Sequence, residues 1–200
     1  RVRTIRVVDQ GEQHPADEAD FIQAKELLGE RLNVVHQPNL GGAGGFSRGM
    51  RDATAACDCM VLLTDDDIRP EPETTLRLSA LAVCAEKPML LGAQMLFLFN
   101  PTSLFRTGET YNWKALTVEE NDPKFGYADV DVRKYHQLRR LGVDYNAWWT
   151  CLVPSEVIEK IGLALPLFFQ YDDIDYGFRA AKAGYPTDTI PGAAGWHADF

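Results

Sequence analysis

Short strand-like segments alternate with longer helix-like segments in the first half of the chain, and this alternation constrains the fold more than any other feature. The strand-like segments are apolar and often β-branched, and segments of helix-forming composition follow them after short connections. The expected strands are residues 3–8, 33–36, 60–64 and 90–98, and the expected helices are residues 17–32, 47–56 and 70–85. This order is typical of an α/β protein with a mostly parallel central sheet flanked by helices. The unbroken apolar character of residues 60–64 predicts that this strand is buried on both faces.

The second half of the chain is less regular. Residues 100–145 are polar and turn-rich, which fits either an insertion that shapes a substrate face or a lid. Within this segment, Asn121-Asp122-Pro123 predicts a loop and residues 129–141 predict an exposed, charged helix. Apolar residues become dense again from Tyr145, and we expect a helix over residues 155–161.

Composition excludes several classes of protein. A chain of 200 residues can form one domain with a sizeable core, and its formal net charge of -9 argues against a nucleic-acid partner, which would need a basic face. No apolar run approaches the roughly 20 residues of a membrane-spanning helix, and we find no signal peptide. The chain starts without methionine and almost directly in a strand, so we expect it to be a piece of a longer protein. The four cysteines lack metal-binding spacing and predict buried free thiols: Cys57, Cys59, Cys84 and Cys151.

Three consecutive carboxylates, Asp65, Asp66 and Asp67, follow the strand at residues 60–64. Ligands of α/β sheets bind at the carboxyl ends of the strands. Two carboxylates in a D-x-D arrangement can hold Mg²⁺ or Mn²⁺, which complete their coordination with water and substrate phosphates. A solvated turn, or a cap on the helix that follows, is the structural alternative. Because a cap needs only one carboxylate, we favour a metal- and phosphate-binding role.

Two further segments are candidates for binding or catalysis. The glycine-rich residues 41–45 match neither a Walker loop nor G-x-G-x-x-G, but they permit close backbone approach to a ligand; a tight turn is the alternative. Asp172 and Asp173 lie between an apolar run and an expected helix. They fit either a general base with its partner or negative charges that favour the helix dipole, and the residues alone do not decide between these.

Aromatic residues and a histidine complete the set. Trp148 and Trp149, beside Tyr145 and Asn146, fit either a simple core or a surface on which a sugar ring stacks. His197, near the end of the chain, is either a structural residue or a further ligand to a metal held by carboxylates.

Taken in order, these motifs resemble those of inverting nucleotide-sugar glycosyltransferases of the A-type, Rossmann-like fold. The resemblance is closer to the bacterial, actinobacterial-type galactofuranosyltransferases that build cell-wall galactan. The motifs that carry it are Val8-Asp9-Gln10-Gly11, Asn39-Leu40-Gly41-Gly42 with Gly44-Gly45-Phe46, Asp65-Asp66-Asp67-Ile68, the segment from Asp144 to Cys151, Asp172-Asp173-Ile174-Asp175-Tyr176-Gly177, Gly184-Tyr185-Pro186, and Pro191-Gly192-Ala193-Ala194 with Trp196-His197.

The resemblance implies a role for each candidate residue. Asp65, Asp67 and His197 would bind the metal, and Asp173 would be the catalytic base with Asp172 beside it. The donor-binding residues would be Asp65, Asp66, Asp67, Gly41, Gly42 and Arg48, and the acceptor-binding residues Trp148, Trp149, Tyr145 and Asn146. Residues 1–200 would then form one catalytic domain, with a nucleotide-sugar-binding half over residues 1–99 and an acceptor-binding half over residues 100–200. The first strand of the fold, which supplies much of the uridine contact, is expected to lie before Arg1.

The implied activity is metal-dependent transfer of galactofuranose from UDP-galactofuranose to a polyprenyl-linked glycan, with inversion at the anomeric carbon. The implied location is the cytoplasm, peripheral to the inner face of the cell membrane, with membrane contact only through missing regions or the acceptor lipid. Other classes stay open: another nucleotide-sugar glycosyltransferase such as a rhamnosyltransferase, a metal-dependent nucleotidyl- or phosphotransferase, and a non-catalytic carbohydrate- or metal-binding module. No residue type here distinguishes a furanose from a pyranose donor.

Overall fold

The computed structural model describes residues 2–56, 58–120, 130–132 and 141–198. The helices are α1 (Ala19–Leu28), α2 (Gly41–Thr54), α3 (Pro72–Cys84), α4 (Ser155–Ile161) and α5 (Asp172–Lys182), with short 3-10 turns at Pro15–Asp17 and Gly29–Arg31. The strands are β1 (Ile5–Asp9), β2 (Leu32–His36), β3 (Met60–Thr64), β4 (Ile68–Pro70), β5 (Leu90–Phe97), β6 (Ser103–Arg106), β7 (Glu109–Asn112), β8 (Thr117–Glu120), β9 (Val130–Asp131), β10 (Leu141–Val143), β11 (Thr150–Pro154) and β12 (Thr187–His197). None of the described helices combines the length and apolar character needed to span a bilayer.

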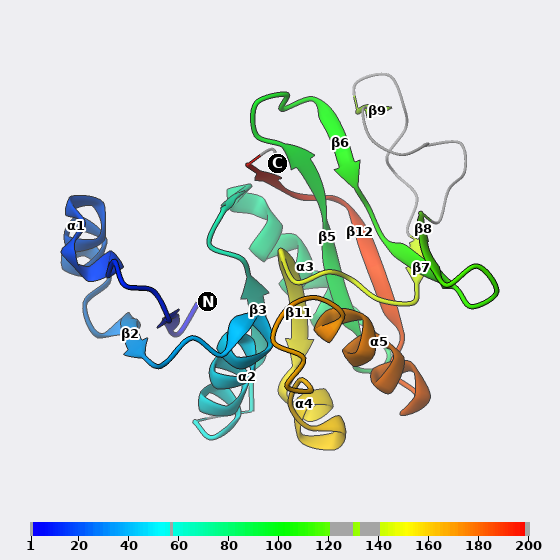
Figure 1. Cartoon of the computed structure of the whole chain (residues 1–200), viewed down its shortest axis with the longest axis horizontal. Coiled ribbons are helices and arrows are strands. Elements are labelled where there is room, and N and C mark those ends of the chain that lie inside the picture. Colours follow the sequence, from blue (N-terminus) through cyan, green and yellow to red (C-terminus); the bar gives the residue numbers. More distant parts are fainter. Residues whose placement is uncertain (1, 57, 121–129, 133–140, 199–200) are drawn as a thin grey trace.

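An eight-stranded sheet forms the centre of the molecule (Figure 1). Its main path has the order β10-β12-β5-β11-β3; β4 pairs with β12, and β6 joins β5 to β9. Alternate residues of β11 point to opposite faces. Cys151 and Val153 contact the core beneath α2, α4 and α5, whereas Leu152 contacts the core beneath α3. The expected α/β architecture, a sheet flanked by helices, is therefore confirmed.

The sheet is mixed, however, and not mostly parallel as the sequence predicted. β12 runs parallel to β5, but β11 runs antiparallel to both β3 and β5. A parallel pair needs a long crossover, usually a helix. The described residues between β5 and β11 form strands and no helix, so the chain re-enters the sheet in the opposite direction.

Three local expectations also differ from the structure. β3 is less buried than predicted: among its residues only Leu63 is buried, and both ends of the strand are exposed. The glycine-rich segment is the first turn of α2, which begins at Gly41 and not near residue 47. Of the cysteines described, only Cys151 is buried. Cys59 is partly exposed and Cys84 is exposed, so the prediction of buried thiols is wrong for these two.

The turn-rich segment from residue 100 contains strands. Two pieces of the helix expected over residues 129–141 are strands, namely β9 and the first residue of β10. Residue 129 and residues 133–140 of that expected helix lie outside the described residues. The loop expected at residues 121–123 lies outside them as well.

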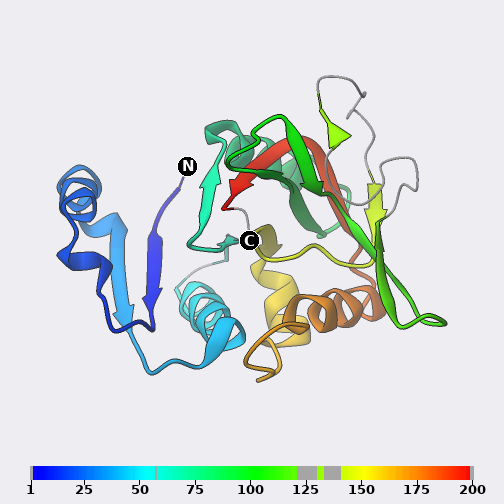
Figure 2. The ribbon, with the colours of Figure 1, turned by 45° about the horizontal axis from the view of Figure 1, so that its top comes forward.

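β1, α1 and β2 form a small unit beside the main body (Figure 2). β1 and β2 are parallel and pair only with each other among the described strands. α1 contributes no buried residue. Polar contacts join the unit to α2: Arg6 pairs with Asp52, and the side-chain amide of Gln10 donates to the carbonyl of Gly41 over 3.0 Å. This unit therefore depends on few apolar contacts.

Candidate active site

Asp65, Asp67 and His197 come together at one edge of the large sheet. The two aspartates lie between β3 and β4, and His197 ends β12. Because β4 pairs with β12 so that Ile68 faces His197, the preceding Asp67 lies beside the imidazole. The Nε2 of His197 is 3.1 Å from Oδ2 of Asp67, and ligand atoms of all three residues lie within 4.8 Å of one another.

This donor set fits a divalent cation. His197 is only 6% exposed, and its Nδ1 lies 2.6 Å from the carbonyl of Ala198. That contact fixes the orientation of the ring and turns Nε2 toward Asp67, as the outer hydrogen-bond partner of a metal ligand does. Two carboxylate oxygens and one imidazole suit Mn²⁺ or a similar ion. Asp66 is exposed beside them.

The environment of Asp65 shows why positive charge would be favoured there. Burial raises the pKa of Asp65 to about 6, and the charges of Asp67 and Asp66 contribute to this rise, while His197 opposes it. A cation would favour the ionised form of such a carboxyl group. A bound cation would therefore relieve the electrostatic repulsion among the three adjacent carboxylates.

Asp172 and Asp173 begin α5, and the charge of Asp172 acts on Asp65 of this cluster. The preceding Tyr171 has a left-handed backbone, with φ 66°, that turns the chain into the helix. Burial raises the pKa of Asp173 to about 7, assisted by the charges of Asp172 and Glu109. Burial also raises the pKa of Asp172, whose charge in turn acts on Asp65. A carboxyl group with a pKa near neutrality can exchange a proton with a substrate hydroxyl.

The start of α2 contacts the loop that leads into Asp172. Gly41 has φ +71°, and a Cβ there would lie 1.9 Å from the carbonyl oxygen of Phe168. At Gly42, a Cβ would lie 3.6 Å from Oδ2 of Asp172. Glycine is therefore needed at residue 41 to let α2 and this loop approach. Arg48, further along α2, pairs with Asp52 over 2.8 Å.

Most of the predicted acceptor residues are in the interior. Trp148 is 4% exposed and packs edge-on against Phe46 and Tyr176, which agrees with the core alternative. Asn146 is 6% exposed and donates to the carbonyl of Asp188 over 2.9 Å. Trp149 is partly exposed and donates its indole N–H to the carbonyl of Ala93. Among the two tryptophans, Trp149 thus has the exposed surface that a sugar would need, and the acceptor roles stay predictions.

Sequence reasoning did not find Glu109, which lies next to this group. Its carboxylate is buried, pairs with Arg106 over 2.8 Å, and hydrogen-bonds the buried Tyr145. Burial raises the pKa of Glu109, and its charge acts on Asp173. Glu109 stands in a turn-rich segment without clear periodicity, so no sequence pattern distinguishes it from a surface acid.

Comparisons with known proteins identify the family of this chain. The family described as glycosyltransferase like family 2 matches residues 1–199. The galactofuranosyltransferase GlfT2 of Mycobacterium tuberculosis is 46% identical over 98% of this chain and 32% of its own length. GlfT2 of Mycolicibacterium smegmatis is 42% identical over the same shares. This chain therefore spans about a third of the length of these relatives.

Solved structures share the fold at low sequence identity. GalNAc-T7, in a structure with UDP, GalNAc and Mn²⁺, has a TM-score of 0.72 and 10% identity, covering 99% of this chain and 38% of its own. The mannosyltransferase PcManGT of Pyrobaculum calidifontis, in complex with GDP-Man and Mn²⁺, has a TM-score of 0.62 and 15% identity, covering 98% and 47%.

Proposed function

Because this chain belongs to the glycosyltransferase-like family 2, we propose that it forms the catalytic domain of a metal-dependent, inverting galactofuranosyltransferase. The proposed reaction transfers galactofuranose from UDP-galactofuranose to a glycan acceptor. The observation that carries this proposal is the grouping of Asp65, Asp67 and His197 at the edge of the sheet, with the charge of the buried Asp172 acting both on Asp65 and on the neighbouring Asp173. The curated relatives named GlfT2 support the donor sugar.

In this proposal Asp65, Asp67 and His197 hold the divalent cation, Mn²⁺ or Mg²⁺. When bound, such an ion neutralises the negative charge that grows on the leaving diphosphate. Asp66, Gly41, Gly42 and Arg48 contribute to donor binding. Residues 1–99 would then form the nucleotide-sugar-binding half, and residues 100–200 the acceptor-binding half.

Asp173 is the proposed general base. In its ionised form it accepts the proton of the acceptor hydroxyl as that oxygen attacks the anomeric carbon from the face opposite the diphosphate. The new glycosidic bond forms as the bond to the diphosphate breaks, so configuration inverts and no covalent enzyme intermediate is needed. Burial, assisted by the charges of Asp172 and Glu109, raises the pKa of Asp173 to about 7, and Trp149 orients the acceptor ring.

The acceptor and location are proposed from the resemblance of the sequence motifs described above. We infer a polyprenyl-linked cell-wall glycan as acceptor, and a cytoplasmic position peripheral to the inner face of the membrane. Contact with the membrane would come through the acceptor lipid or through other parts of a longer protein.

Calorimetric titration of UDP-galactofuranose into the chain, with and without Mn²⁺, tests the proposal. We expect Mn²⁺-dependent binding that Asp67→Ala abolishes and that the exposed-site control Glu86→Gln retains. A transfer assay on a galactofuranose-containing acceptor then tests the chemistry. Donor binding without transfer or donor hydrolysis, unchanged by Asp173→Ala, would favour a non-catalytic module; tighter binding of another nucleotide sugar would reassign the donor.

A further inference from the structure

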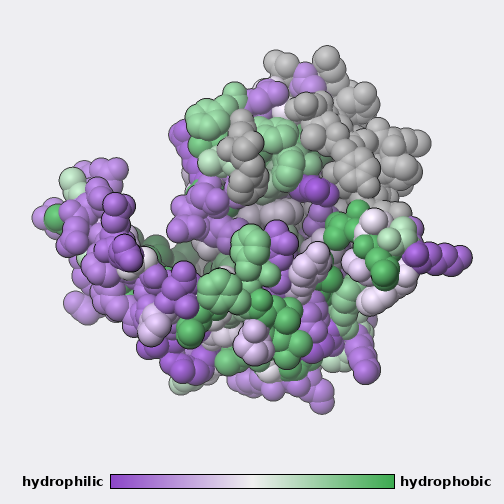
Figure 3. Space-filling model, viewed as in Figure 1, coloured by the Kyte–Doolittle hydropathy of each residue, from purple (hydrophilic) through white to green (hydrophobic). Residues whose placement is uncertain are grey.

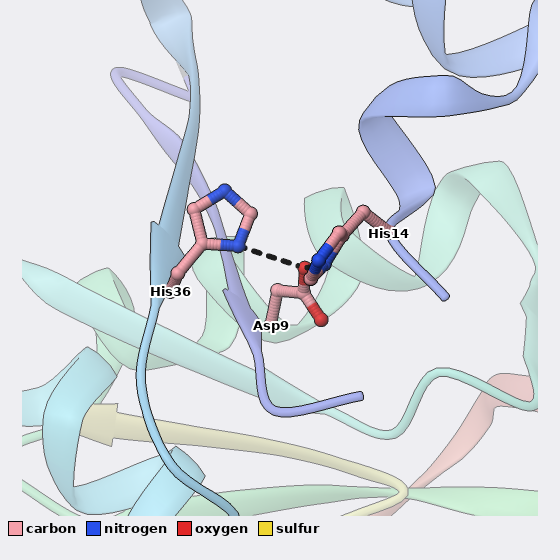
Figure 4. A group of neighbouring side chains, drawn as sticks. All are labelled: Asp9, His14 and His36. Carbon is pink, nitrogen blue, oxygen red and sulfur yellow. Dashed lines mark hydrogen bonds and ion pairs between the residues drawn. The ribbon is translucent and has the colours of Figure 1, made fainter. Parts of the chain in front are cut away.

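A second group of metal-ligating side chains lies on the β1–β2 unit. Asp9 ends β1 and His36 ends β2, and the parallel register places the two residues side by side. His14 follows the turn after β1. The Nδ1 atoms of His14 and His36 lie 2.5 Å and 2.9 Å from the same oxygen, Oδ2 of Asp9 (Figure 4).

The carboxylate of Asp9 is held in place before any ligand arrives. Asp9 is 7% exposed, and its Oδ1 accepts the backbone N–H of Gly11 over 3.0 Å. This bond leaves Oδ2 directed at the two imidazoles. The side chains of His14 and His36 are 45% and 57% exposed, so an ion can reach the three atoms from solvent.

Two imidazole nitrogens and one carboxylate oxygen form a ligand set that zinc uses in proteins. If both rings hydrogen-bonded to one oxygen, each would need its proton on Nδ1, whereas neutral rings can direct both lone pairs at a cation. Tetrahedral coordination with bonds of about 2.0–2.1 Å separates the ligand atoms by about 3.3 Å. From the present distances of 2.5 Å and 2.9 Å, a shift of each Nδ1 atom by less than about 1 Å reaches that separation from Oδ2.

We propose that Asp9, His14 and His36 form a binding site for a zinc-class transition-metal ion, with the fourth coordination position open to water. This site differs from the Asp65 cluster in its residues and in the metal that it prefers, because imidazole suits zinc-class ions and carboxylates suit Mg²⁺ and Mn²⁺. Its existence does not depend on the proposed sugar transfer.

An ion would connect separate elements of the β1–β2 unit. The helix of this unit, α1, has no buried residue, and polar contacts join the unit to α2. Its visible surface is largely hydrophilic (Figure 3). An ion bound by Asp9, His14 and His36 would join β1, β2 and the turn that follows β1, and its binding free energy would stabilise the folded unit.

Titration of Co²⁺ into the Asp65→Asn/Asp67→Asn chain isolates the proposed site. We expect one Co²⁺ ion with the visible absorption of tetrahedral nitrogen and oxygen coordination, displaced by Zn²⁺. His36→Gln and His14→Gln, each added to this background, should weaken Co²⁺ affinity by about 100-fold or more, since loss of even an outer hydrogen-bond partner costs about 10- to 100-fold. The neighbouring exposed Asp17→Asn is the matched carboxylate control and should bind as the background does.

Both histidines are partly exposed, so their variants should fold, and circular dichroism verifies this. Equal Co²⁺ affinity in His36→Gln and the background, or no binding at all, would overturn the site. A thiolate charge-transfer band would do the same by assigning the ion to cysteine. Hydrogen exchange gives an independent readout: Zn²⁺ should slow exchange in β1 and β2 of the natural chain and not of His36→Gln. None of these measurements uses a sugar donor, so this proposal and the proposed function can fail separately.

Discussion

The Asp65–Asp67–His197 cluster lies at the edge of the large sheet. The Asp9–His14–His36 cluster lies instead on the ends of β1 and β2 and the turn after β1, and these two strands pair only with each other among the described strands. The first joins residues far apart in sequence at the ends of packed strands. The second is local and is supported mainly by a turn and polar contacts. The first set is two-thirds carboxylate and the second two-thirds imidazole. In the two proposals, the ligand types match the role proposed for each ion. Oxygen ligands suit an ion that must share substrate phosphates, and nitrogen ligands suit an ion that stabilises its own surroundings.

The largest expected effect is a loss of sugar transfer without a loss of metal binding at either cluster. Asp173→Asn should lower the transfer rate by about 100- to 10,000-fold, because a general base contributes that much. Mn²⁺ binding should persist, since Asp173 belongs to neither cluster. Parallel transfer assays and metal titrations measure the two properties. Asp175→Asn, on the same helix but paired with Arg179, should lose little activity; equal losses in both variants would argue against a base at residue 173.

The next effect sharpens the difference between the clusters. Asp67→Ala should weaken Mn²⁺ affinity by about 100-fold, by analogy with the cost of altering metal-site ligands and their partners. It should leave Co²⁺ binding at the Asp9 cluster unchanged. Calorimetry with each ion checks both statements. A loss at both sites would mean that the two clusters are one coupled unit.

A pH series tests the proton on Asp173. Its pKa of about 7 predicts that kcat/KM falls about tenfold per pH unit below that value, because only the ionised carboxylate accepts a proton. The kcat/KM of Asp173→Asn should not show this fall at low pH. An unchanged profile in the variant would assign the titration to another group.

The same group should affect stability with a defined sign. The pKa of Asp173 is raised on folding, so its contribution to stability is full below the unfolded pKa of 3.8 and is lost as the pH rises through about 7. Asp173→Asn should therefore be more stable than the natural chain at pH 8, by on the order of 1 kcal/mol, and show little difference near pH 4. Calorimetric unfolding at the two pH values measures this.

A last pair of variants tests the contact between the two regions. Gly41 accepts a hydrogen bond from Gln10 of the small unit and contacts Phe168 of the loop before Asp172. Gly41→Ala should destabilise the fold by at least about 1–2 kcal/mol, the cost of a left-handed backbone in a non-glycine residue. Gly49→Ala, on the same helix with nothing within 4 Å of the added carbon, should instead stabilise it by about 0.5–1 kcal/mol. Denaturant unfolding measures the free energy of unfolding of both variants. Equal changes in the two would argue against a special requirement for glycine at residue 41.

The local sequence pattern predicted those elements whose structure is determined by neighbouring residues in the sequence. The run at residues 60–64 is strand β3, and the three acids that follow reach the sheet edge as expected. The start of α2 was missed because glycine has low helix propensity. Tertiary contact with Phe168 favours small residues there instead. Trp148, Glu109 and the pairing of Asp9 with His36 depend on burial and register, which only the folded chain determines.

β12 is the latest of the described strands to be synthesised, yet it lies inside the sheet between β10 and β5. During translation, β5, β11 and the helices beside them therefore emerge from the ribosome before β12, the strand that lies between β10 and β5, has been made. His197 emerges later than any other residue of the Asp65 cluster, so that cluster cannot form until β12 has been added. During synthesis, the nascent chain would expose an unfilled sheet edge at β5, which is a place where premature pairing or chaperone binding can occur.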